Sequence, residues 1–242
     1  MAAERTGPEI VVRRFADRAA LDFALAARLA RACADPAARA SAAVMLSGGD
    51  TPRAVYALTA ARAVVPRSDL VIVYSDERYV PPDSEASNYR STKTLLESLR
   101  LPDERVLRVA TELTLRAAAD DYEARLARLF AGGVGIGFGL LGIGADGHTA
   151  SLFSNADLAR ADGRLAISVR RPDGRDAVSV TPSLLAGVAE PAFVVAGADK
   201  RAAVSALVRG DRELIAWRAI EQCARVEVWT EPEAYPQDRV QL

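Results

Sequence analysis

The stretch Leu140-Leu-Gly-Ile-Gly-Ala-Asp-Gly-His-Thr-Ala-Ser-Leu-Phe153 indicates how this chain is organised. It continues an apolar run that begins at Ile136 and is interrupted by glycines, as in a strand packed closely against its neighbours. The run ends in the turn sequence Gly144-Ala-Asp-Gly147, and His148 follows as the only histidine of the 242 residues. Such a strand places the next side chains at the carboxyl edge of a sheet, where open α/β folds bind ligands.

His148 stands two residues after Asp146 on this tight turn. An imidazole beside a carboxylate suits a general base whose tautomer is fixed by its partner. A lone histidine is nevertheless more often a solvated or hydrogen-bonded side chain, and Asp146-Gly147 could be only a turn. The turn therefore leaves both readings open, and two further loops favour the catalytic one.

Apolar strands alternate with helical patterns along the whole chain. Such alternation predicts a Rossmann-like α/β fold, with a mainly parallel, twisted sheet and helices on both of its faces. We find no internal repeat or Ser/Gly-rich linker, so one domain over residues 1–242 is the simplest expectation. Strands are expected at 9–15, 42–46, 70–74, 136–143, 165–169, 178–181, 192–196 and 226–229. Helices are expected at 18–34, 113–130 and 215–223 and after residues 51, 87, 151, 182 and 200, with a polar loop at 157–164.

The loop Ser47-Gly-Gly-Asp-Thr-Pro52 follows the second expected strand. Thr51 before Pro52 predicts an N-cap and a helix start, and the glycines free backbone N–H groups beside a helix dipole that favours anions. A phosphate fits this loop, although a plain strand–helix turn also needs small residues. It is not a P-loop, because no Gly-Lys-Ser/Thr follows.

The charged run Asp76-Glu-Arg78 follows the third expected strand and precedes Pro81-Pro82. It could be a solvated run, but an arginine fork held there can bind a carboxylate or phosphate in bidentate fashion, with the two acids orienting it. A parallel sheet brings the ends of its strands to one edge, so we expect the loops 47–52, 75–82 and 144–149 to converge.

Charge and cysteine content narrow the functional class. The chain has 31 basic and 32 acidic residues, which gives no electrostatic case for binding nucleic acid or an anionic membrane. Cys33 and Cys223 fit a reducing compartment, and without a signal or spanning sequence we expect a cytoplasmic protein. One histidine and two distant cysteines cannot form an ordinary zinc site.

Two Gly-x-Gly-x-x-Gly matches do not support dinucleotide binding. The match at 137–142 lies within the strand itself. The match at 142–147 lacks the acidic residue that closes the next strand of a dinucleotide fold. The chain also has no Gly-x-Ser-x-Gly sequence, so a hydrolase triad of that type is not supported.

Three motifs, at 47–52, at 76–81 with Ser87-Asn88, and at 142–153, stand in an order and spacing that resemble 6-phosphogluconolactonases. These enzymes belong to a superfamily with the glucosamine-6-phosphate isomerases, and the likeness runs from about Ile10 to Trp229. It implies hydrolysis of 6-phospho-D-glucono-1,5-lactone in the oxidative pentose phosphate pathway, with no cofactor and no required metal. The deaminases of the superfamily typically continue the turn as Ile-Ala-Phe-Asn-Glu-Pro. Here Thr149-Ala-Ser-Leu-Phe153 follows, which favours the lactonase.

The resemblance also implies a role for each matching residue. His148 would take a proton from the water that attacks the lactone carbonyl, and Asp146 would help to set the state of the imidazole. Arg78 would bind substrate and stabilise the developing negative charge. The residues implied to hold the 6-phosphate are Gly48, Gly49, Thr51 and Lys200.

Two positions depart from the family pattern. Asp50 stands where a second serine is usual, so it places a negative charge near the phosphate unless its side chain turns away to cap the helix. Ala177 stands where an arginine is common. The missing charge could come from a substrate-binding arginine of the neighbouring loop, which is Arg175, Arg171 or Arg170.

The expected ligand is a small sugar-phosphate lactone, bound by a monomer or a small homo-oligomer. Two alternatives stay open: a deaminase or isomerase of the glucosamine-6-phosphate type, and a sugar-phosphate-binding protein without turnover. The presence of both His148 and Asp146 argues against the non-catalytic alternative.

Overall fold

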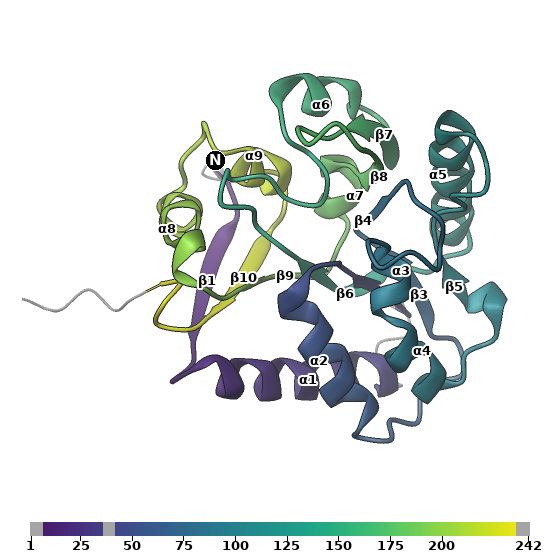
Figure 1. Ribbon diagram of the computed structural model, residues 1–242, viewed down its shortest axis with the longest axis horizontal. Helices are drawn as coiled ribbons and strands as arrows, with labels where there is room; N and C mark the ends of the chain where they lie inside the picture. Colours follow the sequence, from purple (N-terminus) through teal and green to yellow (C-terminus); the bar gives the residue numbers. More distant parts are fainter. Residues whose placement is uncertain (1–6, 36–41, 236–242) are drawn as a thin grey trace, which may run out of the picture.

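A computed structural model describes residues 7–35 and 42–235 of the chain (Figure 1). Within these residues, seven parallel strands form a sheet in the order β1-β10-β9-β6-β2-β3-β5, and three form a small antiparallel sheet in the order β4-β8-β7. The large sheet comprises β1 (Glu9–Arg14), β2 (Ala43–Leu46), β3 (Val71–Tyr74), β5 (Val106–Leu107), β6 (Ile136–Leu141), β9 (Glu190–Val195) and β10 (Arg225–Thr230). The small sheet comprises β4 (Asp76–Arg78), β7 (Ala166–Arg170) and β8 (Asp176–Val180). The predicted α/β class is confirmed, and the antiparallel sheet is an addition to it.

Helices cover both faces of the large sheet, as predicted (Figure 1). One face packs on α1 (Arg18–Ala34), α2 (Asp50–Ala60) and α4 (Lys93–Leu99), next to the short α3 (Asn88–Ser91). The other packs on α5 (Leu115–Ala131), α7 (Pro182–Ala186), α8 (Arg201–Arg209) and α9 (Ile215–Ile220). A hydrophobic core lies on each face of the sheet, and alternate residues of β2 pack into each. Val44 and Leu46 pack into the core on the first face, and Ala43 and Met45 into the core on the second. The central strands are therefore apolar on both sides.

Most of the predicted helix starts are confirmed, but the cap predicted for the helix after residue 51 is wrong. Asp17 caps α1 by accepting the backbone N–H of Ala20, and Thr181 caps α7 ahead of Pro182. Helix α2, however, begins one residue before the predicted cap Thr51, with Gly49 at the N-cap. Gly49 has a backbone φ angle of +112°, which residues with a Cβ atom rarely adopt.

The segment after His148 differs from the predicted helix start at 151 and polar loop at 157–164. Residues 149–152 form turns and isolated bridges, and helix α6 (Asn155–Arg160) follows. The helix is nucleated by a capping box, in which the Ser154 hydroxyl accepts the N–H of Asp157 and the Asp157 carboxylate accepts the N–H of Ser154. Residues 157–160 of the predicted polar loop are therefore helical, and residues 161–163 form a turn after the helix.

The strand order places a crevice between β2 and β6. After β2 the chain builds the sheet outward through β3 and β5, whereas after β6 it builds the opposite half through β9 and β10. The loops after β2 and β6 therefore leave the sheet in opposite directions at a topological switch point, where α/β sheets bind ligands.

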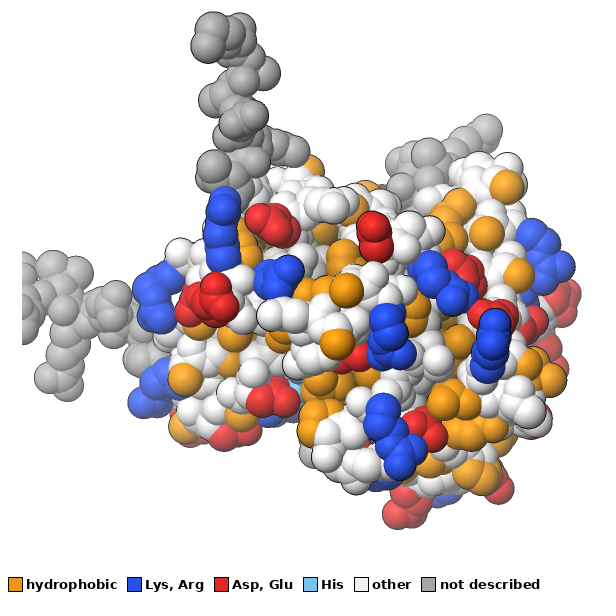
Figure 2. Space-filling view, turned by 90° about the horizontal axis from the view of Figure 1, so that it is seen from above, with side chains coloured by type: hydrophobic (Ala, Val, Ile, Leu, Met, Phe, Trp, Pro, Cys, Tyr) orange, Lys and Arg blue, Asp and Glu red, His pale blue; other side chains and the backbone are white. Residues whose placement is uncertain are grey.

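The surface shows mixed charge. On the face seen in Figure 2, basic and acidic side chains lie interspersed among apolar and polar atoms. Among the described helices, none combines the length and the apolar character that crossing a membrane requires.

Candidate active site

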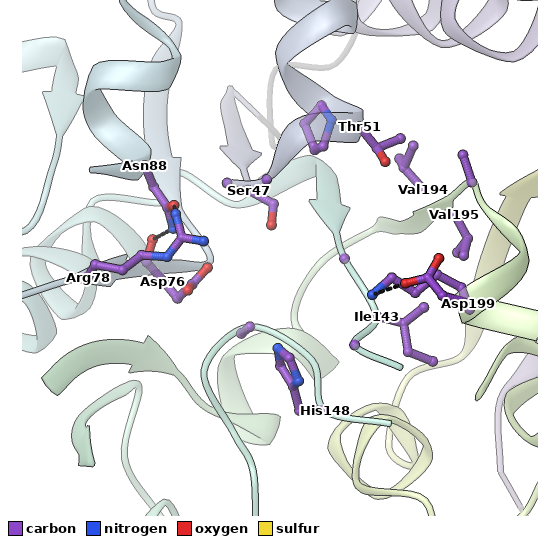
Figure 3. Close-up of a pocket in the computed structure, with 18 of the residues that line it drawn as sticks. Ser47, Thr51, Asp76, Arg78, Asn88, Ile143, His148, Val194, Val195 and Asp199 are labelled. Atoms are coloured by element: carbon purple, nitrogen blue, oxygen red, sulfur yellow. Dashed lines mark hydrogen bonds and ion pairs between the residues drawn. The ribbon is translucent and has the colours of Figure 1, made fainter. Parts of the chain in front are cut away.

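A cavity of about 500 Å³ lies at the carboxyl edge of the sheet, over the switch point. The predicted convergence of the three loops is confirmed, because each contributes lining residues. In Figure 3, Asp76, Arg78 and Asn88 lie on one side of the central space, and Thr51, Val194, Val195, Ile143 and Asp199 lie on the other. Ser47 and His148 lie between these two groups.

The turn after β6 holds His148 against Asp146. The imidazole Nδ1 lies 2.5 Å from Oδ1 of Asp146, and the same oxygen accepts the backbone N–H of His148 at 3.2 Å. The turn is closed by a hydrogen bond from the N–H of Gly144 to the carbonyl of His148. The imidazole also packs on the ring of Phe153, with 4.3 Å between centroids. Burial opposes ionisation of Asp146, but its hydrogen bonds with His148 outweigh that effect and lower its pKa.

Gly144, which the sequence indicated only as part of a turn, leaves room for the contact between His148 and Asp146. A Cβ atom at this residue would lie 2.1 Å from Nδ1 of His148 and 2.2 Å from Oδ1 of Asp146. No side chain fits there, so the close approach of imidazole and carboxylate depends on glycine. Its φ angle is not in the left-handed region, so the requirement is one of space rather than backbone conformation.

Arg78 stands on β4 at the edge of the cavity, and Asn88 fixes its guanidinium. Nη1 of Arg78 donates to the side-chain oxygen of Asn88 and to the carbonyl of Ala86. The amide nitrogen of Asn88 donates to the carbonyl of Asp76 at 2.8 Å, so both ends of this side chain are used. Gly48 makes room for it, because a Cβ there would lie 1.7 Å from the Asn88 oxygen. The sequence motif contained Asn88 without revealing this role.

We expected Asp76 and Glu77 to orient the guanidinium of Arg78, but its partners are instead Asn88 and Ala86. Glu77 is buried and accepts hydrogen bonds from the N–H groups of Asn88 and Tyr89, both at 2.7 Å, and from the hydroxyl of Ser87. Burial raises the pKa of Glu77, and these hydrogen bonds work against that rise. Glu77 therefore positions the start of α3, and through it Asn88. The Asp76 carboxylate lines the cavity and is held by two serine hydroxyls, those of Ser75 and Ser151.

The other end of the cavity carries the residues expected to hold phosphate. Gly48, Gly49 and Thr51 line it at the start of α2. Lys200, the residue immediately before α8, lines it as well. Nζ of Lys200 lies 3.2 Å from a carboxylate oxygen of Asp199. The side chain of Asp50 lies outside the described part of the structure. Within the described ranges, no cluster of three His, Cys, Asp or Glu side chains could hold a metal ion.

Comparison with known proteins places the chain in a family. The family model for glucosamine-6-phosphate isomerases/6-phosphogluconolactonase matches residues 16–229. The chain belongs to this family. It is 34% identical over 188 residues to a 6-phosphogluconolactonase of Synechocystis, covering 73% of this chain and 74% of that one. It is 31% identical over 226 residues to the human 6-phosphogluconolactonase, covering 88% and 86% of the two chains.

A solved structure agrees with this family assignment. The crystal structure of a 6-phosphogluconolactonase from Thermotoga maritima superposes with a TM-score of 0.78 at 25% sequence identity. The match covers 92% of this chain and 99% of that one. The fold is therefore shared with the Thermotoga maritima protein over 92% of this chain.

The three arginines considered as replacements for the family arginine at Ala177 lie in different places. Among described residues, Arg171 lines the cavity, and its guanidinium lies 5.1 Å from the centroid of the Phe153 ring. Arg175 lies over an adjoining depression that shares Gly49 and Arg78 with the cavity, and it pairs with Asp173 at 2.8 Å. Arg170 pairs with Asp176 at 2.9 Å. Ala177 itself is buried, opposite Arg78 in the β4–β8 pair.

Proposed function

We propose that this member of the family is a 6-phosphogluconolactonase that hydrolyses 6-phospho-D-glucono-1,5-lactone to 6-phospho-D-gluconate with His148 as general base. In this account the reaction is a step of the oxidative pentose phosphate pathway. The pairing of His148 with Asp146 at the cavity carries the proposal, because it orients an imidazole toward a space large enough for a sugar phosphate. The names of the two relatives compared above, and of the Thermotoga maritima protein, support the choice of substrate.

The state of the imidazole follows from its partner. A carboxylate facing Nδ1 stabilises the tautomer that carries its proton on Nδ1, which leaves the lone pair on Nε2. Nε2 accepts a proton from water as the water oxygen bonds to C1 of the lactone. The tetrahedral intermediate then collapses, the bond between C1 and the ring oxygen breaks, and the imidazolium returns the proton to the departing alkoxide. No redox partner or second substrate is needed.

Arg78 supplies positive charge where the carbonyl oxygen becomes negative. Its guanidinium is fixed by Asn88 and Ala86 before substrate binds, so little reorganisation is required as charge develops. Glu77 supports this arrangement indirectly, since it holds the backbone of Asn88. The hydroxyl-bound carboxylate of Asp76 suits the sugar hydroxyls better than the phosphate, because it would repel an anion.

The phosphate lies at the Thr51 and Lys200 end of the cavity in this account. The first turn of α2 offers backbone N–H groups and a favourable helix dipole, and Lys200 offers a charge. Of the three arginines near Ala177, we assign the replacement charge to Arg171, because it lines the cavity whereas Arg175 and Arg170 do not within the described residues.

Turnover of freshly prepared lactone, corrected for spontaneous hydrolysis, tests this function. The parallel measurement is ammonia release from glucosamine 6-phosphate. Lactone turnover without ammonia supports the lactonase, and ammonia release would assign the chain to the deaminase branch. Binding of 6-phosphogluconate without turnover of either substrate would identify a sugar-phosphate-binding protein instead.

A further inference from the structure

Arg18 is a cavity residue that no sequence motif contains. It is the first residue of α1, and its side chain lines the same cavity as Thr51 and Lys200. Its Nε lies 2.8 Å from each carboxylate oxygen of Asp22, one helical turn later. Its Nη2 lies 3.4 Å from the carbonyl oxygen of Thr51, in the first turn of α2. The packing of α1 on α2 therefore delivers a guanidinium to the loop expected to hold phosphate.

The position is electrostatically unfavourable for a cation unless an anion joins it. Arg18 stands at the N-terminus of α1 and reaches the N-terminal turn of α2, and both helix dipoles are positive at these ends. Asp22 offsets part of this charge and fixes Nε, while Asp17 is engaged by the N–H of Ala20. Nη2 makes one long contact, to the carbonyl of Thr51, and Nη1 has no partner among the described residues, so the guanidinium can still donate to oxygen atoms of a ligand at the cavity.

We propose that Arg18 is a second cationic ligand of the substrate phosphate, acting with Lys200 on one phosphate monoester dianion. This inference rests on the proposed function for the identity of the substrate. Arg18 supplies a cation beside Thr51, whereas Arg171, to which we assign the charge missing at Ala177, contacts Ser151 and Phe153. A lysine and an arginine match the two negative charges of a phosphate monoester near neutral pH.

The variant Arg18→Met tests this role by comparing two substrates. We expect kcat/KM for the phosphorylated lactone to fall by about tenfold or more, mainly through KM, because one charge-assisted contact to phosphate is lost. The kcat/KM for unphosphorylated glucono-1,5-lactone should change by less than about twofold. Arg18→Lys should restore part of the loss, since it keeps the charge without the planar fork.

Arg62→Met is the matched control. Arg62 also connects the two helices, because its Nη2 lies 3.4 Å from the carbonyl of Phe23 in α1 and its guanidinium packs on the Phe23 ring. Arg62 is not among the described residues that line the cavity. The variant Arg62→Met should therefore leave the ratio of kcat/KM for the two lactones unchanged. An equal loss on both lactones in Arg18→Met, with the same loss in Arg62→Met, would overturn the proposal in favour of a structural role.

A binding measurement separates this inference from the lactonase assignment. Calorimetric titration of inorganic phosphate and of 6-phosphogluconate requires no turnover, so it tests Arg18 even in a chain that hydrolyses neither lactone. Arg18→Met should bind both at least about tenfold more weakly than wild type and Arg62→Met. Equal affinities in Arg18→Met and wild type, or no phosphate binding by wild type, would overturn the proposal. If Arg18→Met is unfolded, Arg18→Gln decides the question, since it is polar but uncharged and an unchanged affinity in that variant contradicts a cationic contact with phosphate.

Discussion

The Nδ1 atom of His148 and the Oδ1 atom of Asp146 lie 2.5 Å apart, and that oxygen also accepts the backbone N–H of His148. A single carboxylate oxygen thus fixes both the imidazole and the turn that presents it. Two residues of separation suffice because the turn is closed by the hydrogen bond between Gly144 and the carbonyl of His148. The imidazole and its carboxylate partner are therefore one local unit rather than side chains brought together by the fold.

Asp146→Asn should lower kcat on the lactone by on the order of a hundredfold, because an amide can also stabilise the tautomer that leaves Nε2 protonated. The change removes charge but little volume, so the fold should persist. The predicted loss is checked by measuring kcat of wild type and of Asp146→Asn on the lactone at pH 7. A kcat within about threefold of wild type would show that the carboxylate does not set the state of His148.

The lowered pKa of Asp146 also predicts a pH dependence of stability. A carboxyl group whose pKa is lower in the folded state stabilises the protein above its unfolded pKa, and this contribution is lost as pH falls through the folded pKa. The melting temperature of wild type should therefore exceed that of Asp146→Asn most clearly above about pH 4. The gap should narrow below that pH. A gap that widens on acidification would contradict the assigned direction of the pKa shift.

Gly144→Ala should abolish most activity while the protein stays folded, because the new Cβ atom occupies the space between imidazole and carboxylate. We expect a loss on the order of a hundredfold, close to that of removing a positioned base. Gly132→Ala is the control away from the cavity, since Gly132 does not line it and a Cβ there would come no closer than 3.3 Å to another atom. Equal activity in the two variants would show that the 2.5 Å approach of His148 to Asp146 is dispensable.

Arg78→Lys should not recover what Arg78→Ala loses, because a point charge cannot reproduce a planar fork held by Asn88 and Ala86. We expect both variants to lose at least about tenfold in kcat/KM. Arg90→Lys serves as the control, since Arg90 contacts the carbonyl of Asp83 and is not among the described cavity residues. If Arg78→Lys equals wild type, Arg78 contributes only a general charge.

Lys200→Met should raise KM for the phosphorylated lactone far more than KM for unphosphorylated gluconolactone. The reason is that Lys200 borders the cavity at the start of α8, where a cation is disfavoured by the helix dipole unless an anion is bound. The ratio of the two kcat/KM values should fall by about tenfold or more, and Arg201→Met, which removes an exposed neighbour, should leave it unchanged. An unaltered ratio in Lys200→Met would remove this residue from the phosphate site.

Much of the site was predictable because it follows from strand order. Glycine and charged residues stood directly after apolar strands, and a parallel sheet must bring those positions to one edge. The three loops at 47–52, 75–82 and 144–149 therefore meet as expected. The pairing of His148 with Asp146 was also visible, since both lie on one short turn.

Other features depend on contacts that a linear reading does not contain. Arg18 reaches the cavity only through the packing of α1 on α2, and nothing in its sequence neighbourhood marks it. The role of Asn88 requires the space above Gly48, and that of Gly144 requires knowing where two side chains meet. The capping box of Ser154 and Asp157 is a sequence signal, but Asp157 was interpreted as the start of a polar loop.

The central claim is that His148 is the general base of a lactone hydrolase. It is tested most directly by the rate of hydrolysis of freshly prepared 6-phosphogluconolactone with wild type and with His148→Gln, each corrected for spontaneous hydrolysis and matched for folded protein by circular dichroism. We expect rapid turnover by wild type and a loss of roughly a hundredfold to ten-thousandfold in the variant. A variant that hydrolyses the lactone at nearly the wild-type rate above background would contradict it.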